Sequence, residues 1–282
     1  MKTSVSTYSF GPYVESLGIY GVIDKTAEFG FDGIEFVEAG WSNASLDELK
    51  KIGEYAASKG LALASFCVGA DFVNGSGGDT KAEIERVKGM VDKAAALGVK
   101  NMRHDVASQP HGKINISYDD ALPTMANAIR EVAAYAESKG VGTMTENHGF
   151  FSQDVLRVEK LINTVSHPNF GALVDLGNFM CADEDPWKSV AILAPYAKHV
   201  HAKDFFKKSG MEVAPGAGWF QTRAGDYLRG TIIGHGDARI YQSIQTLKKY
   251  GYDGFVTVEF EGMEDNLKGI QLGLDNLKRF IG

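Results

Sequence analysis

The stretch Val141–His148 (VGTMTENH) carries side chains that bind metals or transfer protons at the end of an apolar run. Such a run predicts a buried strand, and because side chains alternate along a strand, Glu146 and His148 are expected on one face together with Met144. A carboxylate and an imidazole on one face can act as metal ligands or as a general acid and base. The alternative is that the ENHG sequence forms only a turn. The ends of the other strands decide between the two.

Three other predicted strands also end in side chains that packing does not explain. They are Asp175 in ALVD, His199 and His201 in HVHAKD, and Glu259 and Glu261 in VTVEFEG. Carboxylates gathered at one place repel one another, which raises their pKa values, unless a cation lies among them. Oxygen-rich sets with one histidine suit Mn²⁺, Mg²⁺, Co²⁺ or Zn²⁺ and favour the harder ions. We therefore expect a divalent metal site where these strands end.

These strand ends belong to a regular alternation of short apolar runs and longer stretches of helical period. The helix that follows Ser45 is predicted to begin with a capping box, because Glu48 lies three residues after the cap. The segment 204–236 is polar and glycine-rich and shows no clear period. Strands are predicted at 3–6, 33–37, 61–67, 101–106, 141–146, 170–175, 197–203 and 254–260, and helices at 21–29, 46–59, 80–97, 118–138, 153–165, 187–193, 238–250 and 266–280.

Eight units of strand and helix, with no linker or change of composition between them, predict one domain over residues 1–282. Parallel strands joined by helices form buried sheets, and eight such units close into a (β/α)8 TIM barrel, whose active site lies at the C-terminal ends of the strands. An open, doubly wound sheet is the competing fold. It is disfavoured because no G-x-G-x-x-G follows the first strand and because polar residues end several strands instead of lining one crevice.

The composition is that of a globular protein, with 44% hydrophobic and 23% charged residues. The net charge of −7, from 29 basic and 36 acidic residues, repels a phosphate backbone, so no nucleic acid partner is expected. The N-terminus lacks the apolar segment of a signal peptide and no run is long enough to cross a membrane, so a cytoplasmic protein without a membrane partner is expected. Cys67 and Cys181 lack zinc or disulfide spacing and are predicted to be small buried residues. A homo-oligomer is the expected assembly, with a hetero-oligomer as the alternative.

Five motifs together resemble a known family. They are GFDGIEF at 30–36, ENH at 146–148, VDLGN at 174–178, HVHAKD at 199–204 and GYDGFVTVEFEG at 251–262. In this order they are similar to the xylose isomerase-like barrels of the sugar phosphate isomerase/epimerase superfamily, and the resemblance covers essentially the whole chain. It implies the TIM barrel fold and a small-molecule sugar or keto-polyol as the substrate.

In the epimerases of that superfamily, a single divalent metal ion is held by Glu, Asp, His and Glu. The matching positions in this chain are Glu146, Asp175, His201 and Glu259. The resemblance implies that Glu146 and Glu259 also move protons on opposite faces of the reacting carbon, and Mn²⁺ is the expected ion, with Mg²⁺, Co²⁺ or Zn²⁺ as alternatives. A metal ion here polarises a carbonyl and stabilises the enediolate that forms when the neighbouring proton leaves. The expected function is a metal-dependent sugar or keto-polyol isomerase or epimerase.

Elimination from the same enediolate is the alternative reaction. Loss of a β-substituent would make the protein a lyase or dehydratase, acting on a keto-inositol or cleaving a C-glycoside or 3-keto-glycoside. His148 is expected as the additional acid or base on which this choice depends. The chain has Asn178 where ketohexose epimerases carry a histidine, and Lys203 where an arginine shortly follows the metal histidine. These departures leave room for a lyase.

Two other classes of function are less favoured. An apurinic endonuclease-type metal hydrolase needs further metal histidines at the third and fourth strands and a basic face, whereas Cys67 ends the third strand and the net charge is −7. A non-catalytic sugar-binding barrel would tolerate loss of the four metal ligands, and their presence argues against it.

Several more residues are expected near the substrate. Glu35 either lines the cavity or forms a structural ion pair, and alternation along the fourth strand turns either Arg103 and Asp105 or His104 inward. His199 is expected to be a hydrogen-bonded core histidine. The predicted substrate-binding residues are Glu35, Arg103, His104, Asn178, Lys203 and His235.

Overall fold

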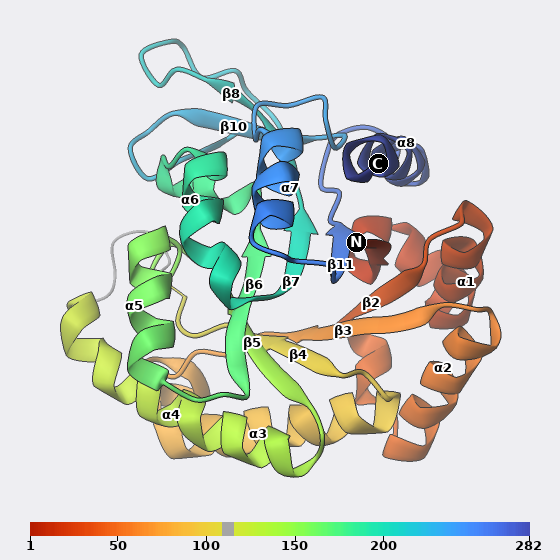
Figure 1. Ribbon diagram of the computed structural model, residues 1–282, viewed down its shortest axis with the longest axis vertical. Coiled ribbons are helices and arrows are strands. Elements are labelled where there is room, and N and C mark those ends of the chain that lie inside the picture. The colour runs from red at the N-terminus through yellow and green to blue at the C-terminus, as the bar shows by residue number, and fades with distance from the viewer. Residues whose placement is uncertain (109–115) are drawn as a thin grey trace.

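The computed structural model describes residues 1–108 and 116–282 and has a closed barrel of parallel strands at its centre (Figure 1). Neighbouring strands follow the chain in order, and β1 pairs with the last strand to close the barrel. The predicted (β/α)8 TIM barrel is therefore confirmed. Its strands are β1 (Lys2–Ser6), β2 (Gly33–Val37), β3 (Ala62–Val68), β4 (Asn101–His104), β5 (Gly142–Glu146), β6 (Phe170–Asp175), β7 (Ala197–Ala202) and β11 (Phe255–Val258).

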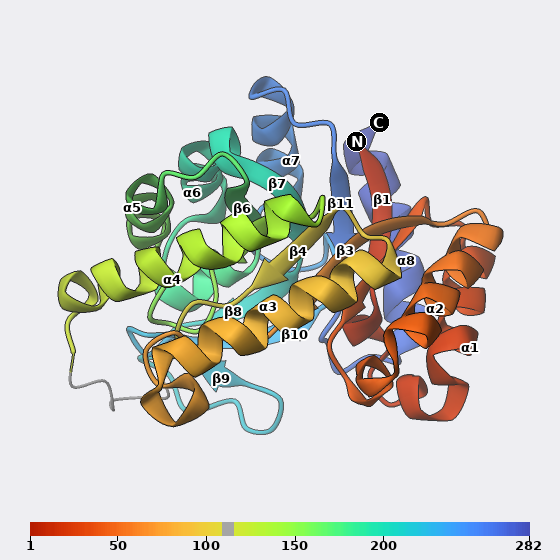
Figure 2. The same cartoon turned by 90° about the horizontal axis from the view of Figure 1, so that it is seen from below.

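Helices cover the outside of the barrel (Figures 1 and 2). Each strand is almost wholly buried because side chains of one face fill the barrel and those of the other pack under the helices. The helices are α1 (Tyr13–Phe29), α2 (Leu46–Ser58), α3 (Thr80–Leu97), α4 (Tyr118–Ser138), α5 (Val155–Val165), α6 (Pro186–Leu193), α7 (Ile240–Lys249) and α8 (Asn266–Ile281), with short 3₁₀ helices η1 (Thr7–Phe10), η2 (Gly40–Asn43), η3 (Gly75–Gly78), η4 (Asn178–Ala182) and η5 (Ala194–Tyr196). In the part of the chain described, none of the helices combines the length and hydropathy needed to cross a bilayer.

Two helix starts differ from the prediction. Ser45 caps α2 by accepting a hydrogen bond from the Glu48 N–H at 3.3 Å, but the Glu48 carboxylate accepts from Tyr20 and Lys51 instead of completing the capping box. Helix α1 begins earlier than predicted, at Tyr13. Gly18 inside it has a φ of 63°, a left-handed conformation that breaks the helical period in the sequence.

The segment 204–236, for which the sequence predicted no regular structure, contains a three-stranded antiparallel sheet. Its strands are β8 (Asp204–Lys208), β9 (Phe220–Gln221) and β10 (Tyr227–Thr231), in the order β8-β10-β9. These strands are short and partly exposed, so no apolar alternation marks them in the sequence. Only Lys203 separates β8 from β7, so the sheet stands at the C-terminal end of the barrel (Figure 2).

Asp204 fixes the return from this sheet to α7. Its buried carboxylate accepts hydrogen bonds from the N–H groups of Gly234, Gly236 and Ala238 at 2.8 to 3.0 Å. A carboxylate with several backbone donors holds a turn in one conformation. The added sheet is thus attached rigidly at its base.

Candidate functional site

Four potential metal ligands come together at the C-terminal ends of adjacent strands. Glu146 ends β5, Asp175 ends β6, His201 lies near the end of β7 and Glu259 directly follows β11. One donor atom from each lies within 4.8 Å of the others. The first three residues are at most 4% exposed, and the side chain of Glu259 is 12% exposed. We call these four residues the metal quartet.

Three donor atoms of the quartet are buried without a well-aligned hydrogen bond. Among the residues that the structure describes, Asp175 Oδ2, His201 Nδ1 and Glu259 Oε2 have charged neighbours: one another and Lys203 Nζ. His201 Nδ1 lies 3.9 Å from Asp175 Oδ2 and 3.3 Å from Glu259 Oε2. Buried polar atoms are normally satisfied, and convergent unsatisfied oxygen and nitrogen atoms fit a divalent cation.

Asn147 explains why β5 and β6 end in register at this place. Its side chain donates from Nδ2 to the Asp175 carbonyl and accepts from the Asp175 N–H on Oδ1, both at 2.9 Å. It thereby bridges the two strands one residue beyond Glu146. The ENHG stretch is therefore both a turn and part of the site, because Asn147 in the turn holds two quartet residues together.

Lys203 supplies positive charge next to the quartet. Its Nζ forms ion pairs with Glu259 Oε2 at 2.7 Å and Asp175 Oδ2 at 3.3 Å, and the residue is 6% exposed. Burial raises the pKa of Asp175 to about 7, with Glu146 and Glu259 adding to the effect of burial and Lys203 opposing it. Burial also acts to raise the pKa of Glu259, but Lys203 and His201 hold it well below its usual value. Glu259 is therefore ionised at neutral pH.

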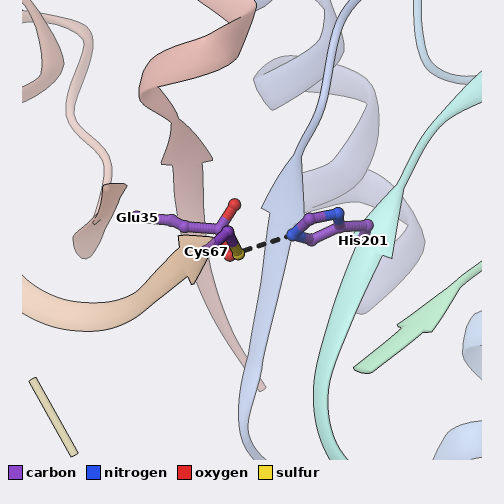
Figure 3. Close-up of side chains that lie close together, drawn as sticks. All are labelled: Glu35, Cys67 and His201. Carbon is purple, nitrogen blue, oxygen red and sulfur yellow. Dashed lines mark hydrogen bonds and ion pairs between the residues drawn. The ribbon is translucent and has the colours of Figure 1, made fainter. Parts of the chain in front are cut away.

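Glu35 supports His201 from below the quartet. Its Oε2 lies 2.9 Å from His201 Nε2, 3.0 Å from His199 Nε2 and 2.5 Å from Ser65 Oγ. Figure 3 shows Glu35 and Cys67 facing this nitrogen of His201. The contact assigns the Nε2 proton and leaves Nδ1 free to face the quartet. Glu35 is fully buried, so of its two predicted environments the structure shows the ion pair.

Glu35, Cys67 and His201 also form a group with metal-ligand spacing. The nitrogen of His201 in this group is Nε2, which contacts Glu35, whereas Nδ1 faces the quartet. Burial raises the pKa of the Cys67 thiol to about 12, which disfavours the thiolate that a metal needs. Both cysteines are free and buried, as predicted.

Two of the predicted substrate-binding residues hold Glu146. Arg103 Nη2 lies 2.6 Å from Glu146 Oε2, and Asn178 Nδ2 donates to Glu146 Oε1 at 2.8 Å. Asn178 Oδ1 in turn accepts from Lys203 Nζ at 3.3 Å. The carboxylate of Glu146 is thus oriented by a cation on one oxygen and an amide on the other.

Asp105 is a residue whose role the sequence did not reveal. It lies 2.8 Å from Arg103 Nη2, and its Oδ1 lies 2.9 Å from Nδ1 of His148. Burial acts against the charge of Asp105, but Arg103 and His148 lower its pKa to about 2. His148 lies two residues beyond the end of β5, where strand alternation no longer applies, yet it lines the same cavity. Arg103 and Asp105 are two positions apart on β4 and its extension, and this spacing is the sequence signal that both face the same side.

His104 and His235 are not brought to the site. The ring of His104 stacks on Phe170 at 5.9 Å and contacts Phe72, on the helix side of β4, and burial lowers its pKa to about 4. His235 is exposed in the turn between β10 and α7. Neither is among the described residues that line the cavities at the barrel mouth. Arg103, and not His104, is the inward-facing residue of β4.

The quartet opens into a cavity of about 180 Å³ at the mouth of the barrel. Its walls combine side chains that can bind a metal with acidic and basic ones, and they come from seven of the eight barrel units. The lining residues are Tyr8, Val37, Cys67, Arg103, Glu146, His148, His201, Lys203, Glu259 and Glu261.

Comparison with known proteins identifies the fold family. A family model described as xylose isomerase-like TIM barrel matches residues 23–280. The chain belongs to this family. Among the xylose isomerase-like barrels, it is 28% identical over 175 residues to an inosose dehydratase from Clostridium perfringens, a match over 60% of this chain and 58% of that protein. The match thus spans a little over half the length of that curated relative.

Solved structures of the same shape include an epimerase and a metal complex. D-psicose 3-epimerase from Clostridium cellulolyticum H10 superposes with a TM-score of 0.77 at 16% identity, over 100% of this chain and 99% of that one. A xylose isomerase-like TIM barrel protein from Mycobacterium smegmatis in complex with magnesium gives 0.74 at 17% identity, over 100% and 98%. The relatives are enzymes that include epimerases and dehydratases.

Proposed function

We propose that this protein is a divalent-metal-dependent isomerase or epimerase that moves a proton next to a carbonyl of a sugar or keto-polyol through an enediolate. The observation that carries the proposal is the metal quartet, whose buried donor atoms converge next to a cavity. Similarity to an epimerase and a dehydratase supports it.

Glu146, Asp175, His201 and Glu259 are the proposed ligands of one divalent ion. In this place they would hold a Lewis acid that could polarise the substrate carbonyl and offset the charge of a developing enediolate. Mn²⁺ is the proposed ion because the three carboxylates are hard ligands and the imidazole is a borderline one, a combination that suits Mn²⁺. The magnesium complex of a related barrel supports an ion of this class.

Glu259 is the proposed base. Lys203 and His201 keep its carboxylate ionised, so it can accept the proton that leaves the carbon next to the carbonyl. Glu146 in its carboxylic acid form is the proposed partner that returns a proton, so that Glu146 ends the step ionised while Glu259 ends it protonated; a water molecule is the alternative donor. Arg103 and Asn178 hold the Glu146 side chain in one orientation. Return to the same carbon gives an epimer, and return to the neighbouring carbon gives an isomer.

Arg103, Asn178 and Lys203 are the proposed contacts of substrate hydroxyl groups. Arg103 and Lys203 line the cavity with nitrogen atoms next to the quartet. Glu35 is proposed as a positioning residue for His201, because it is fully buried beneath the ligand. We do not extend the proposal to His104 or His235, which lie away from the cavity.

Elimination is the second candidate, and the pair of His148 and Asp105 favours it. Asp105 holds Nδ1 of His148, so the other ring nitrogen can donate a proton to a leaving oxygen at the cavity. Burial acts to lower the pKa of His148, but Asp105 raises it, which maintains the acid form. The likeness to an inosose dehydratase supports a lyase as well. An endonuclease is not proposed, because His104 at the fourth strand faces the helices.

Solvent exchange and metal analysis test the proposal. The purified protein is expected to bind one divalent ion per chain and, with Mn²⁺, to place deuterium from D₂O at a carbinol carbon of a ketose or keto-inositol. Release of water or of an aglycone would support the elimination branch. A protein that bound no divalent ion and exchanged no proton in any such compound would contradict the proposed function.

A further inference from the structure

A second cavity lies beside the candidate metal centre, on the side of the added sheet. Its volume is about 230 Å³, against about 180 Å³ for the first. The two cavities share His148, Lys203 and Glu261 in their walls. A ligand that extends past these three side chains would therefore occupy both. The proton transfer proposed above uses only the first cavity.

Aromatic side chains form the far wall of the second cavity. Phe150 comes from the loop after β5, Phe205 from β8 and Phe220 from β9. Phe205 and Phe220 meet edge to face, with ring centroids 5.6 Å apart. Phe205 is 1% exposed and Phe220 is 39% exposed, so part of an aromatic surface is open to the cavity. A ligand ring that covers this surface would remove it from water.

The strand that carries Phe220 is fastened to the barrel. Arg223, which follows β9, donates from its guanidinium to the carbonyl of Phe150 and to the carboxylate of Asp154. Its backbone N–H donates to the carbonyl of Cys181 at 3.0 Å. The wall of the second cavity is thus held in place before a ligand arrives, which lowers the entropy cost of binding.

Two polar side chains of this cavity, Gln153 and Gln221, already make hydrogen bonds within the protein. Gln153 donates from Nε2 to the carbonyl of Asn178 at 2.9 Å and accepts from the Phe150 N–H at 2.7 Å, and it is 2% exposed. Gln221 donates to the carbonyl of Gly225. Hydroxyl groups of a second sugar that lay against the three phenylalanine rings would therefore find few partners, and buried unsatisfied hydroxyls weaken binding.

We propose that the second cavity binds a flat aromatic ring carried by the sugar or polyol whose reacting carbon lies in the first cavity. The inference rests on the proposed function and narrows its substrate class to sugars with an aryl substituent. The sugar part meets the charged and metal-capable side chains, and the ring packs against Phe150, Phe205 and Phe220. The smaller cavity, with its charged side chains, corresponds to the sugar, and the larger one, with its three phenylalanines, corresponds to the ring.

Non-reacting glycosides test the inference without turnover. Dissociation constants of phenyl β-D-glucoside, methyl β-D-glucoside and cellobiose are measured by NMR titration of the Mg²⁺-loaded protein, and saturation transfer locates the bound protons. We expect the phenyl glucoside to bind about tenfold more tightly than the methyl glucoside, with the strongest saturation on its ring protons. Cellobiose, whose second ring is a sugar, is expected to bind no better than the methyl glucoside.

Two variants at Phe220 and one matched control make the test specific. Phe220→Ala is expected to reduce the preference for the phenyl glucoside about three- to tenfold, and Phe220→Trp to retain it. Trp187→Ala removes an aromatic side chain of similar exposure, 42%, from α6 and is expected to leave the preference unchanged. Equal binding of phenyl and methyl glucosides, tighter binding of cellobiose, or equal effects of Phe220→Ala and Trp187→Ala would each overturn the inference.

Metal and exchange measurements separate this inference from the proposed function. Metal binding and proton exchange without a phenyl preference would contradict the aryl site alone. A phenyl preference in a protein that neither binds a divalent ion nor exchanges a substrate proton would contradict the proposed function, and with it the assignment of the ring as part of a reacting substrate.

Discussion

Glu35 Oε2 lies 2.9 Å from His201 Nε2, on the side of the imidazole opposite the metal quartet. The carboxylate fixes the ring so that Nδ1 points to Asp175 and Glu259. Residues in this position raise the basicity of a ligating histidine and typically change metal affinity 10- to 100-fold when mutated. Glu35 can therefore be tested as a positioning residue apart from the ligands themselves.

The variant Glu35→Gln should weaken metal binding without removing a ligand. We expect the dissociation constant for Mn²⁺, measured by calorimetry, to rise at least about tenfold, because the amide keeps the shape of the carboxylate but not its charge. Ser65→Ala, which removes one donor to the same oxygen, is the control and should have a smaller effect. An unchanged affinity in Glu35→Gln would show that the contact does not support the ligand.

Asp175 makes the stability of the metal-free protein depend on pH. Its pKa is raised from 3.8 to about 7, so the folded state binds this proton more tightly than the unfolded state. The stabilisation is complete below the unfolded value and is lost as the pH rises through about 7. We expect the Tm of the metal-free protein to fall between pH 5 and pH 8.

A bound divalent ion should reverse this loss, because it binds the ionised carboxylate. The increase in Tm on adding Mn²⁺ should therefore be larger at pH 8 than at pH 5. Asp175→Asn should reduce both the pH dependence and the response to the ion. Thermal melts with and without chelator measure these effects, and a rise in Tm that is the same at both pH values would disagree with the assignment.

His148 should distinguish elimination from proton exchange. If His148 donates the proton to a leaving group, His148→Gln should lower the rate of elimination about 10²- to 10⁴-fold, while solvent exchange of the neighbouring C–H should fall much less. Both rates can be followed by NMR in D₂O. His235→Gln, at an exposed turn away from the cavities, tests the position of that residue and should leave both rates unchanged. Equal losses of both rates in His148→Gln would assign it a role in orienting Glu146 instead.

Glu83 should stabilise the fold against acid, far from the quartet. Its carboxylate accepts from Arg86, from Ser76 Oγ and from the Asp71 N–H, and despite burial these contacts lower its pKa from 4.5 to about 2. The stabilisation is present above pH 4.5 and is lost as the pH falls towards 2. Glu83→Gln should lower the free energy of unfolding at pH 7 by about 1–2 kcal/mol. This value is smaller than the pKa shift alone implies, because Arg86 is partly exposed and solvent screens its ion pair with Glu83. Urea unfolding at pH 7 and pH 3 checks this, and an equal difference at both values would contradict it.

The sequence predicts the barrel well because its signals are local. Glycines end helices, apolar runs mark strands, and polar residues at strand ends show where the mouth lies. Alternation alone could not decide between Arg103 and His104, because both faces of a barrel strand are buried and either residue can be accommodated. The structure decides it through the partners of each, Glu146 for Arg103 and Phe170 for His104.

Other parts of the site depend on contacts between distant segments, which no local pattern encodes. Glu35 meets His201 across 166 positions of the chain, and Asp105 meets His148 across 43. The strands of the added sheet are too short and too exposed to show a period. The second cavity has walls from both β9 and the loop after β5, which Arg223 joins by donating to the carbonyl of Phe150.

Lys203 is the single residue between β7 and β8. The cation that pairs with Asp175 and Glu259 is therefore also the joint between the barrel and the added sheet. An insertion or deletion at this joint would displace the charge from the carboxylates, whereas changes in the strand tips around Phe220 would not. Substitutions in the outer sheet can thus change which groups the mouth admits, while the ion pairs of Lys203 constrain the length of this one-residue joint.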